Sequence, residues 1–267
     1  MTTLDIPRVL PVDHLSVSSV NAYLRCPLKW RKRYIDREYE PPSGSMILGS
    51  AVGAAEAQAD QQQIDAGDRL STSEVLDAFS DEWDDRSTRE EVDWNGEKPD
   101  ALKDSGVAVV TAYERTVAPR LQPVSAEREF TLQLPGVDWT FTGYFDLEEA
   151  DGGIVDRKVK AKRLNPAEAL VDLQPTSYLL ARRAEGNPAP EFRYHTLVRT
   201  KTPAVDVIPA RRTDVQLDAF VDRLYGIAAE INWRLETGVW GGAVPGSWWC
   251  SERFCGYWSR CPLGGAR

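Results

Sequence analysis

Three charged residues near the middle of the chain have types and spacing that suit metal-dependent chemistry on a phosphate. Asp156 and Lys158 are two residues apart in the β-like run 154–158, and Asp146 ends the preceding β-like run. Side chains at positions i and i+2 of a strand project to the same face. Two carboxylates can bind Mg²⁺, which keeps several waters, and a nearby ammonium can orient one water or stabilise phosphate charge.

The turn between these two runs decides how the three side chains meet. If the loop is the three residues 151–153, Asp146 lies opposite Lys158 and Glu148 lies opposite Asp156, all on one face. A loop of even length would turn Asp146 to the other face unless a bulge corrected it. The alternative is a solvated hairpin face, where a cross-strand ion pair contributes under ~1 kcal/mol.

A longer ordered set of residues carries a family resemblance. Asp146, then Asp156-Arg157-Lys158, then Gln174-x-x-x-Tyr178, resembles the PD-(D/E)XK nuclease superfamily. It is most similar to the RecB-type branch with an iron–sulfur cluster, which includes AddB-type domains and CRISPR-associated adaptation nucleases. The resemblance runs from Ser16 to Cys261. It implies an α/β fold with a restriction-endonuclease-like core, in which a mixed central β-sheet is flanked by helices and a helical insertion is added.

The resemblance implies a metal-dependent DNA exonuclease that acts on DNA ends or single strands, in recombination, repair or phage DNA processing. Mg²⁺ or Mn²⁺ would be held by Asp146, Asp156 and the backbone carbonyl of Arg157. Lys158 would position the attacking water. Gln174 and Tyr178 lie at i and i+4 of a predicted helix and would orient Lys158 and the DNA strand. The alternative reading of this pair is a buried tyrosine with a polar neighbour.

One departure from the family pattern concerns a metal ligand. The family has a G-x-x-x-H pattern at the start of a helix, and Gly49 matches its glycine, but Gly53 stands at the histidine position. Glu56, one turn further along, shares that face and is a substitute ligand in our prediction. The small residues Gly49, Ala51 and Gly53 also suit close helix packing. The missing histidine keeps a second hypothesis open, a non-catalytic DNA-binding or recombination accessory protein on the same fold.

The four cysteines lie near the two ends of the chain: Cys26, Cys250, Cys255 and Cys261. Four thiolates suffice for a [4Fe–4S] cluster or a structural zinc, and spacing does not separate the two; unligated buried cysteines are the third reading. The family resemblance selects the cluster, although the four-residue gap between Cys250 and Cys255 exceeds the usual two. A cluster would clamp the two ends together. The loop-closure entropy that this removes from the unfolded chain corresponds to about 5 kcal/mol of stability.

Charge limits how the chain could meet nucleic acid. The net charge is −9, from 32 basic and 41 acidic residues, which argues against broad nonspecific affinity but leaves room for local basic stripes. The alternative reading of the basic residues in segment 25–37 is a solvated helix face. Glu127 and Glu129 are read as the solvent face of an edge strand, although one of these two glutamates could add a carboxylate to the metal site. The DNA-contacting residues that we predict are Arg25, Lys29, Lys160, Lys162 and Arg163. A recombination or replication protein is a further expected partner.

Aromatic side chains crowd the C-terminal tail around residues 248–258, including Trp248, Trp249, Tyr257 and Trp258. Such rings could stack on single-stranded bases, which contributes ~1–3 kcal/mol per base. We favour a role in shielding the cluster and the core.

The resemblance implies one RecB-like nuclease domain over residues 1–267. Its parts are a helical region 16–120, a catalytic sheet core 121–212 and a C-terminal helix with the cysteine tail 213–267. Helices 73–87 and 101–118 are expected to form an insertion without chemistry. The other predicted elements are an extended lead-in 1–15, helices at 16–26, 27–35, 47–65, after 165, after 172 and at 214–236, a three-stranded antiparallel meander at 126–134, 138–148 and 153–160, and strands at 191–200 and 204–210.

Hydropathy gives an expectation for the compartment. The chain has no apolar run near ~18 residues, and its first ten residues lack the charged and apolar regions of a signal peptide. We therefore expect a soluble protein of the cytoplasm, or of the host cytoplasm if the gene belongs to a phage.

Overall fold

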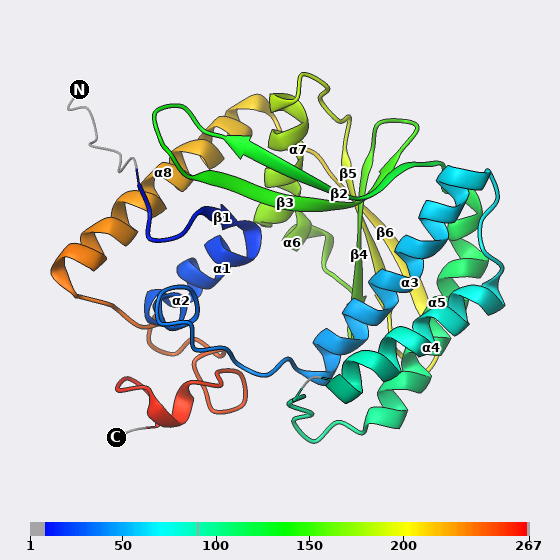
Figure 1. The fold of residues 1–267 in the computed structure, drawn as a ribbon, viewed down its shortest axis with the longest axis horizontal. Coiled ribbons are helices and arrows are strands. Elements are labelled where there is room, and N and C mark those ends of the chain that lie inside the picture. Colours follow the sequence, from blue (N-terminus) through cyan, green and yellow to red (C-terminus); the bar gives the residue numbers. More distant parts are fainter. Residues whose placement is uncertain (1–8, 90, 266–267) are drawn as a thin grey trace. The chain divides into compact units, whose positions relative to one another are not determined.

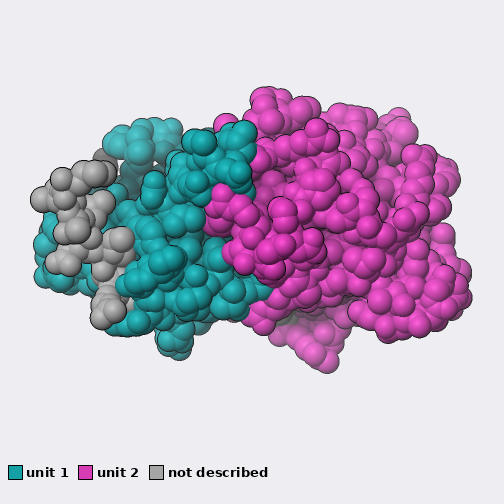
Figure 2. Space-filling model, turned by 90° about the horizontal axis from the view of Figure 1, so that it is seen from above, with its two compact units in different colours: residues 1–40, 130–143, 213–267 teal, residues 41–129, 144–212 magenta. Residues whose placement is uncertain are grey.

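The computed structural model describes residues 9–89 and 91–265 (Figure 1). The chain forms two compact units, each built from segments that are distant in sequence. One consists of residues 1–40, 130–143 and 213–267, and the other of residues 41–129 and 144–212 (Figure 2). The residues predicted to do chemistry around Asp146 and Asp156 all belong to the second unit, whereas the four cysteines belong to the first.

A mixed β-sheet is the centre of the fold, as the sequence predicts. Its strand order is β1-β3-β4-β5-β6, with β2 paired to β3. The pairs β1–β3 and β4–β5 are parallel, and β3–β4 and β5–β6 are antiparallel. The strands are β1 His14–Ser16, β2 Pro123–Gln133, β3 Thr140–Glu149, β4 Ile154–Lys160, β5 Phe192–Val198 and β6 Ala204–Ala210.

The lead-in prediction misses β1, because a strand of three residues is too short to show an alternating pattern. It is recognisable only through its partner, since His14 pairs with Thr140 in β3.

The helices begin where local capping signals place them. Asp172 accepts a hydrogen bond from the Gln174 N–H, and Thr213 forms the predicted capping box with Gln216. Pro99 opens a helix at its first position, where the missing N–H of proline costs no hydrogen bond. The helices are α1 Val17–Arg25, α2 Pro27–Tyr34, α3 Gly44–Ala66, α4 Thr72–Arg89, α5 Pro99–Thr116, α6 Pro166–Val171, α7 Leu173–Ala184 and α8 Asp214–Thr237, with 3-10 turns at Ala118–Arg120 and Trp258–Arg260.

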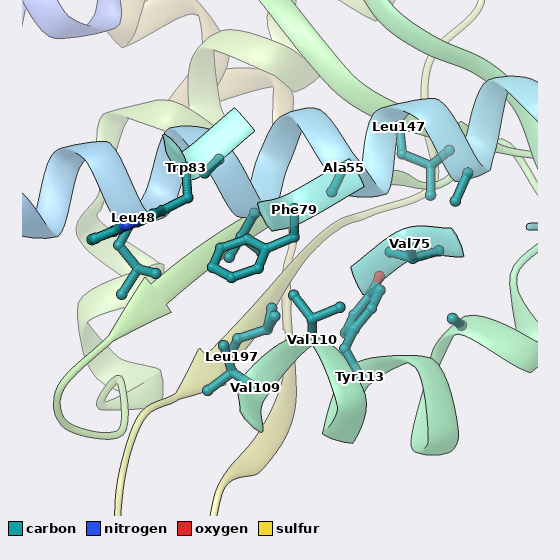
Figure 3. Packing of buried hydrophobic residues seen from close by; sticks show 14 of the residues in the cluster. Leu48, Ala55, Val75, Phe79, Trp83, Val109, Val110, Tyr113, Leu147 and Leu197 are labelled. Atoms are coloured by element: carbon teal, nitrogen blue, oxygen red, sulfur yellow. The ribbon is translucent and has the colours of Figure 1, made fainter. Parts of the chain in front are cut away.

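Helices α3, α4 and α5 pack on one face of the sheet and share its hydrophobic core (Figure 3). Leu147 of β3 and Leu197 of β5 lie in the same buried cluster as Leu48, Phe79 and Val110 from the three helices. The prediction of an insertion packed beside the core therefore needs correction, because α4 and α5 contribute to the core itself. A β-carbon at Gly106 of α5 would collide with the Phe79 ring, so this glycine permits the close approach of α4 and α5.

Alternation along β4 sends its side chains to opposite faces of the sheet. Arg157 points to the helical layer, where its guanidinium contacts Asp60 of α3 and Tyr113 of α5. Asp156 points the other way and contacts Gln174 of α7. The strand thus presents its charged neighbours to two different environments.

The helices of the structure contain no long apolar stretch, consistent with the hydropathy of the sequence in the described residues. In the part of the chain that the structure describes, no helix is long and apolar enough to cross a bilayer.

Candidate active site

Strands β3 and β4 separate at the two predicted acids. Their ladder pairs Leu147 with Val155 and Glu148 with Ile154, so Asp146 and Asp156 are each the next residue beyond it. The predicted register is wrong by two residues, because the connection is longer than a three-residue loop. A shift of two preserves the alternation, so the expected common face of Asp146 and Asp156 is confirmed.

Where the ladder ends, the backbone of β4 takes a side chain as its partner. The Arg157 N–H donates a hydrogen bond to Oδ2 of Asp146 at 3.0 Å. This contact fixes one carboxylate of the site and holds it beside the other.

Asp156 is the buried centre of the cluster, with no exposed surface. The Lys158 ammonium lies 2.7 Å from its Oδ2 and 2.9 Å from its Oδ1. The Gln174 amide donates to Oδ1 and also to the Tyr178 hydroxyl at 3.0 Å. Oδ2 has the ion contact with Lys158 but no hydrogen-bond partner of good geometry. The structure thus brings Lys158, Gln174 and Tyr178 to the same carboxylate.

Mutual repulsion and burial shape the protonation of this cluster. Burial raises the pKa of Asp156 to about 7, with Asp146 adding to the shift and Lys158 opposing it. Burial by itself would lower the pKa of Lys158, but Asp156 and Asp146 together raise it above its usual value. A bound cation would relieve the repulsion between these two carboxylates.

A cavity of about 810 Å³ opens beside the cluster and is lined by Asp146 and Lys158. Glu127 of β2 also lines it and is exposed, in agreement with the reading as the solvent face of an edge strand. Its backbone is left-handed, with φ of 47°, and burial followed by the charge of Asp146 raises its pKa to about 7. The opposite wall is formed by α3, including Gly49 and Gly53.

Glu56 does not join the site, contrary to its predicted role as a substitute ligand. Its side chain is fully buried, and its Oε2 lies 2.6 Å from the Arg69 guanidinium. Neither Glu56 nor Asp156 lines the cavity, but Asp156 contacts Lys158, which does, whereas Glu56 contacts Arg69. Arg69 also pairs with Asp60 and Glu114, so Glu56 belongs to a buried ionic network between α3 and α5.

This network reaches the site through Arg157, and the sequence analysis missed it. The Arg157 guanidinium contacts Asp60 Oδ2 at 2.6 Å and the Tyr113 hydroxyl at 3.0 Å. Tyr113 in turn lies 2.9 Å from Nδ1 of His195 on β5. Because its members come from segments far apart in the chain, no local spacing could have revealed it. It ties β4 to α3 and α5 directly behind Asp156 and Lys158.

The donor set suits a hard divalent cation bound through few protein ligands. Among residues 9–89 and 91–265, no group of three or more His, Cys, Asp and Glu side chains is arranged to hold a metal ion. Mg²⁺ is commonly held by one or two carboxylates, with waters and substrate phosphates completing its shell. Asp146 and the Oδ2 of Asp156, which has an ion contact with Lys158 but no hydrogen-bond partner, meet this requirement.

The four cysteines gather in the other unit. All are free thiols, and all line one cavity of about 430 Å³. Burial raises the pKa of Cys26 and Cys255, and the Lys29 N–H donates to Cys26 Sγ at 3.4 Å. Tyr257 is buried beside them, whereas Trp248 is 64% exposed. The chain thus brings distant cysteines to one place, although not at ligand geometry.

The predicted DNA-contacting cations differ in their availability. Arg25, Lys160 and Lys162 are exposed. Lys29 forms an ion pair with Glu40 at 2.6 Å, and Arg163 pairs with Asp206.

Comparison with known proteins decides the family. The model of the PD-(D/E)XK nuclease superfamily matches residues 14–262. The chain belongs to this superfamily. In this PD-(D/E)XK protein, the predicted residues Asp146 and Asp156 lie on β3 and β4. No curated protein matches the chain in sequence.

One solved structure that matches this PD-(D/E)XK protein shares its fold. A "Putative exonuclease" from Eubacterium rectale is 14% identical, with a TM-score of 0.59 over 87% of this chain and 85% of that one. The structure of SSO0001 is 10% identical, with a TM-score of 0.33 over 85% of this chain and 88% of that one.

Proposed function

We propose that the chain is a Mg²⁺- or Mn²⁺-dependent DNA exonuclease of the RecB-like branch, acting at DNA ends or on single strands in recombination, repair or phage DNA processing. The observation that carries this proposal is the arrangement of Asp146 and Asp156. One carboxylate is fixed by the Arg157 N–H, and the other is buried against Lys158. The chain also belongs to a superfamily of nucleases.

In this proposal Asp146, Asp156 and the backbone carbonyl of Arg157 hold the divalent ion. The ion supplies Lewis-acid stabilisation of the phosphate and makes bound water a better nucleophile. The Lys158 ammonium orients the attacking water or contacts the phosphate from its position beside Asp156. Gln174 holds Oδ1 of Asp156, and Tyr178 supports Gln174, so the carboxylate keeps one orientation.

The direct test is incubation of end-labelled single-stranded and duplex DNA with Mg²⁺ or Mn²⁺. Wild type should release nucleotides, and Asp156→Ala and Lys158→Ala should not. Lys103→Ala is a matched control, because Lys103 lies on α5 and pairs with exposed Asp84. Full metal-dependent activity in both site variants would refute the assignment.

A second candidate is a non-catalytic DNA-binding or recombination accessory protein. The observation that favours it is Gly53, which leaves no imidazole on the α3 wall of the cavity. This candidate predicts binding of DNA without cleavage in any divalent metal.

We also propose that Cys26, Cys250, Cys255 and Cys261 hold a [4Fe–4S] cluster that ties the two ends of the chain together. The shared cavity of the four thiols supports this, since thiolates of a reduced intracellular protein commonly bind metal. Anaerobically purified protein should be brown and contain iron and labile sulfide. A colourless protein that contains stoichiometric zinc would contradict the cluster and indicate a structural zinc site instead.

The proposed DNA contacts are phosphate contacts by Arg25, Lys160, Lys162 and Arg163. Lys29 would contact a phosphate only if its ion pair with Glu40 opened, and otherwise that pair has a structural role. Charge-removing variants should weaken binding uniformly across sequences and lower its salt dependence by about one counterion each.

A further inference from the structure

The hydroxyl of Tyr194 on β5 is a buried hydrogen-bond donor next to the site. Tyr194 pairs with Asp156 in the parallel ladder of β4 and β5, so the two side chains project to the same face of the sheet. Only 2% of Tyr194 is exposed, and its hydroxyl donates to Oδ2 of Asp172 at 3.0 Å. Burial, followed by the charges of Asp172 and Asp156, raises the pKa of Tyr194, so the hydroxyl keeps the proton that it donates.

Asp172 receives a second donor from α7. Its Oδ1 accepts a hydrogen bond from the Gln174 N–H at 3.0 Å, which caps the helix. A cap requires only this contact, whereas the contact with Tyr194 ties the first turn of α7 to the sheet. Burial and the charge of Asp146 raise the pKa of Asp156, and Asp172 adds to the shift, so this third acid lies within electrostatic reach of the site.

These contacts close a ring of partners around Asp156. The Gln174 side-chain amide donates to Oδ1 of Asp156, and the Gln174 main chain donates to Asp172. Asp172 accepts from Tyr194, whose backbone is paired with that of Asp156. All four residues belong to the unit that contains residues 144–212. A displacement of the Asp172 carboxylate would therefore move the Gln174 amide relative to Asp156.

Arg212 fixes the start of α7 by separate contacts. Its guanidinium donates to the main-chain oxygens of Ala169 and Asp172, at 2.8 and 3.0 Å, and to the Thr176 hydroxyl at 2.8 Å. These hydrogen bonds do not involve the Tyr194 hydroxyl. Removal of that hydroxyl should therefore leave the segment folded, and its effect on the site can be measured by itself.

We propose that Asp172 and Tyr194 are positioning residues that set the orientation of the Asp156 carboxylate through Gln174. This inference rests on the proposed function, because it takes Asp156 as a ligand of the divalent ion. Neither Asp172 nor Tyr194 contacts the ion or the phosphate. Partners that orient a metal ligand strongly affect how tightly the metal is bound. Loss of the Tyr194 hydroxyl should therefore weaken metal binding although every ligand remains.

Mn²⁺ binding to the DNA-free protein, measured by electron paramagnetic resonance, tests this proposal. Tyr194→Phe removes only the hydroxyl and keeps the charge of Asp172 and its helix cap. Tyr23→Phe is a matched control, since Tyr23 is also 2% exposed and donates to a carboxylate, that of Glu230, at 3.0 Å. Asp172→Asn keeps an oxygen for the Gln174 N–H but offers a nitrogen where Oδ2 accepts from Tyr194.

Tyr194→Phe should weaken Mn²⁺ binding by about three- to tenfold, since direct partners of a metal ligand contribute ~10–100-fold and Tyr194 acts through two further residues. Asp172→Asn should weaken it by about tenfold or more, because it also removes a negative charge within reach of the ion. Tyr23→Phe should lower Tm by an amount similar to Tyr194→Phe and leave Mn²⁺ affinity unchanged. Wild-type affinity in Tyr194→Phe, or an equal loss in Tyr23→Phe, would overturn the proposal.

A double variant tests the route through Gln174. In a Gln174→Ala protein the Tyr194 hydroxyl has no side-chain amide to position, so adding Tyr194→Phe should change Mn²⁺ affinity by less than about twofold. A general loss of stability would instead weaken binding by the same factor in both backgrounds. An additive loss in the double variant would therefore overturn the positioning role.

Wild type and variants separate this proposal from the proposed function. If wild type binds Mn²⁺ but cleaves no DNA, the nuclease function fails, and the Mn²⁺ affinities of the variants still decide the positioning role. If wild type cleaves DNA and Tyr194→Phe binds Mn²⁺ as tightly as wild type, the nuclease function stands and the positioning role fails. A wild type that binds no Mn²⁺ would overturn both.

Discussion

The main-chain N–H of Arg157 donates to Oδ2 of Asp146 across the fork between β3 and β4, at 3.0 Å. The backbone that connects Asp156 to Lys158 therefore also sets the position of the second carboxylate. The Arg157 side chain is anchored on the opposite face to Asp60 and Tyr113. One residue thus couples both acids of the site to the helical layer behind it.

The support that Gln174 gives to Asp156 predicts a graded loss of activity. Gln174→Ala should lower cleavage by roughly 10–100-fold and weaken the apparent affinity for Mn²⁺, because the carboxylate loses the donor that orients it. Tyr178→Phe should have a smaller effect, since the Tyr178 hydroxyl contacts the Gln174 amide, which in turn donates to Asp156. Metal titrations of the cleavage rate measure both effects. Equal losses in kcat with unchanged metal dependence would argue against an orienting role.

The buried pairing of Asp60 predicts a large loss of stability. Asp60 carries no exposed surface and pairs with Arg69 at 2.5 Å and Arg157 at 2.6 Å. Asp60→Asn leaves both guanidiniums short of a counter-charge, at a cost of about 3–5 kcal/mol. Urea unfolding measures the change in free energy. Asp65→Asn, on the exposed end of the same helix, is the control and should shift the midpoint little; equal effects would remove the network from the account.

The burial of His195 predicts destabilisation in mild acid. Burial, followed by the charges of Arg157 and Arg193, lowers its pKa from 6.5 to about 3. As pH falls through 6.5 the unfolded chain gains a proton that the folded chain does not take up. Neutral His195 therefore contributes fully to the free energy of unfolding above pH 6.5. This contribution is lost as the pH falls toward 3, by up to about 1.4 kcal/mol per pH unit.

Urea unfolding at several pH values between about 7 and 5 measures that slope. His195→Asn keeps a polar atom for Tyr113 but does not titrate, so its acid slope should be shallower than that of wild type. Identical slopes in the two proteins would show that other groups govern acid stability.

Local signals explain what the sequence could predict. The side-chain oxygens of Asp172 and Thr213 cap helices within a few residues, and the i, i+2 spacing of Asp156 and Lys158 fixes a common face in any strand. Alternation survives an error of two residues in register, so the site was recoverable although the connection between β3 and β4 was misjudged.

Long-range packing and backbone conformation explain what could not be predicted from the sequence. Glu127 is exposed as the alternation of β2 predicts, but that it faces the cavity beside Asp146 depends on the packing around the strand. Glu56 is drawn away by Arg69, thirteen residues on, whose role depends on the packing of α3 against α5. The open space beside Gly53 likewise depends on the surrounding atoms, and glycine alone suits packing and openness equally.

The central claim is that Asp146 and Asp156 share one divalent ion. Electron paramagnetic resonance of Mn²⁺ titrated into the DNA-free protein measures this directly. The account predicts one bound Mn²⁺ in wild type and in Glu56→Gln, and weakened or absent binding in both Asp146→Asn and Asp156→Asn. Unchanged Mn²⁺ binding in the two aspartate variants would contradict it.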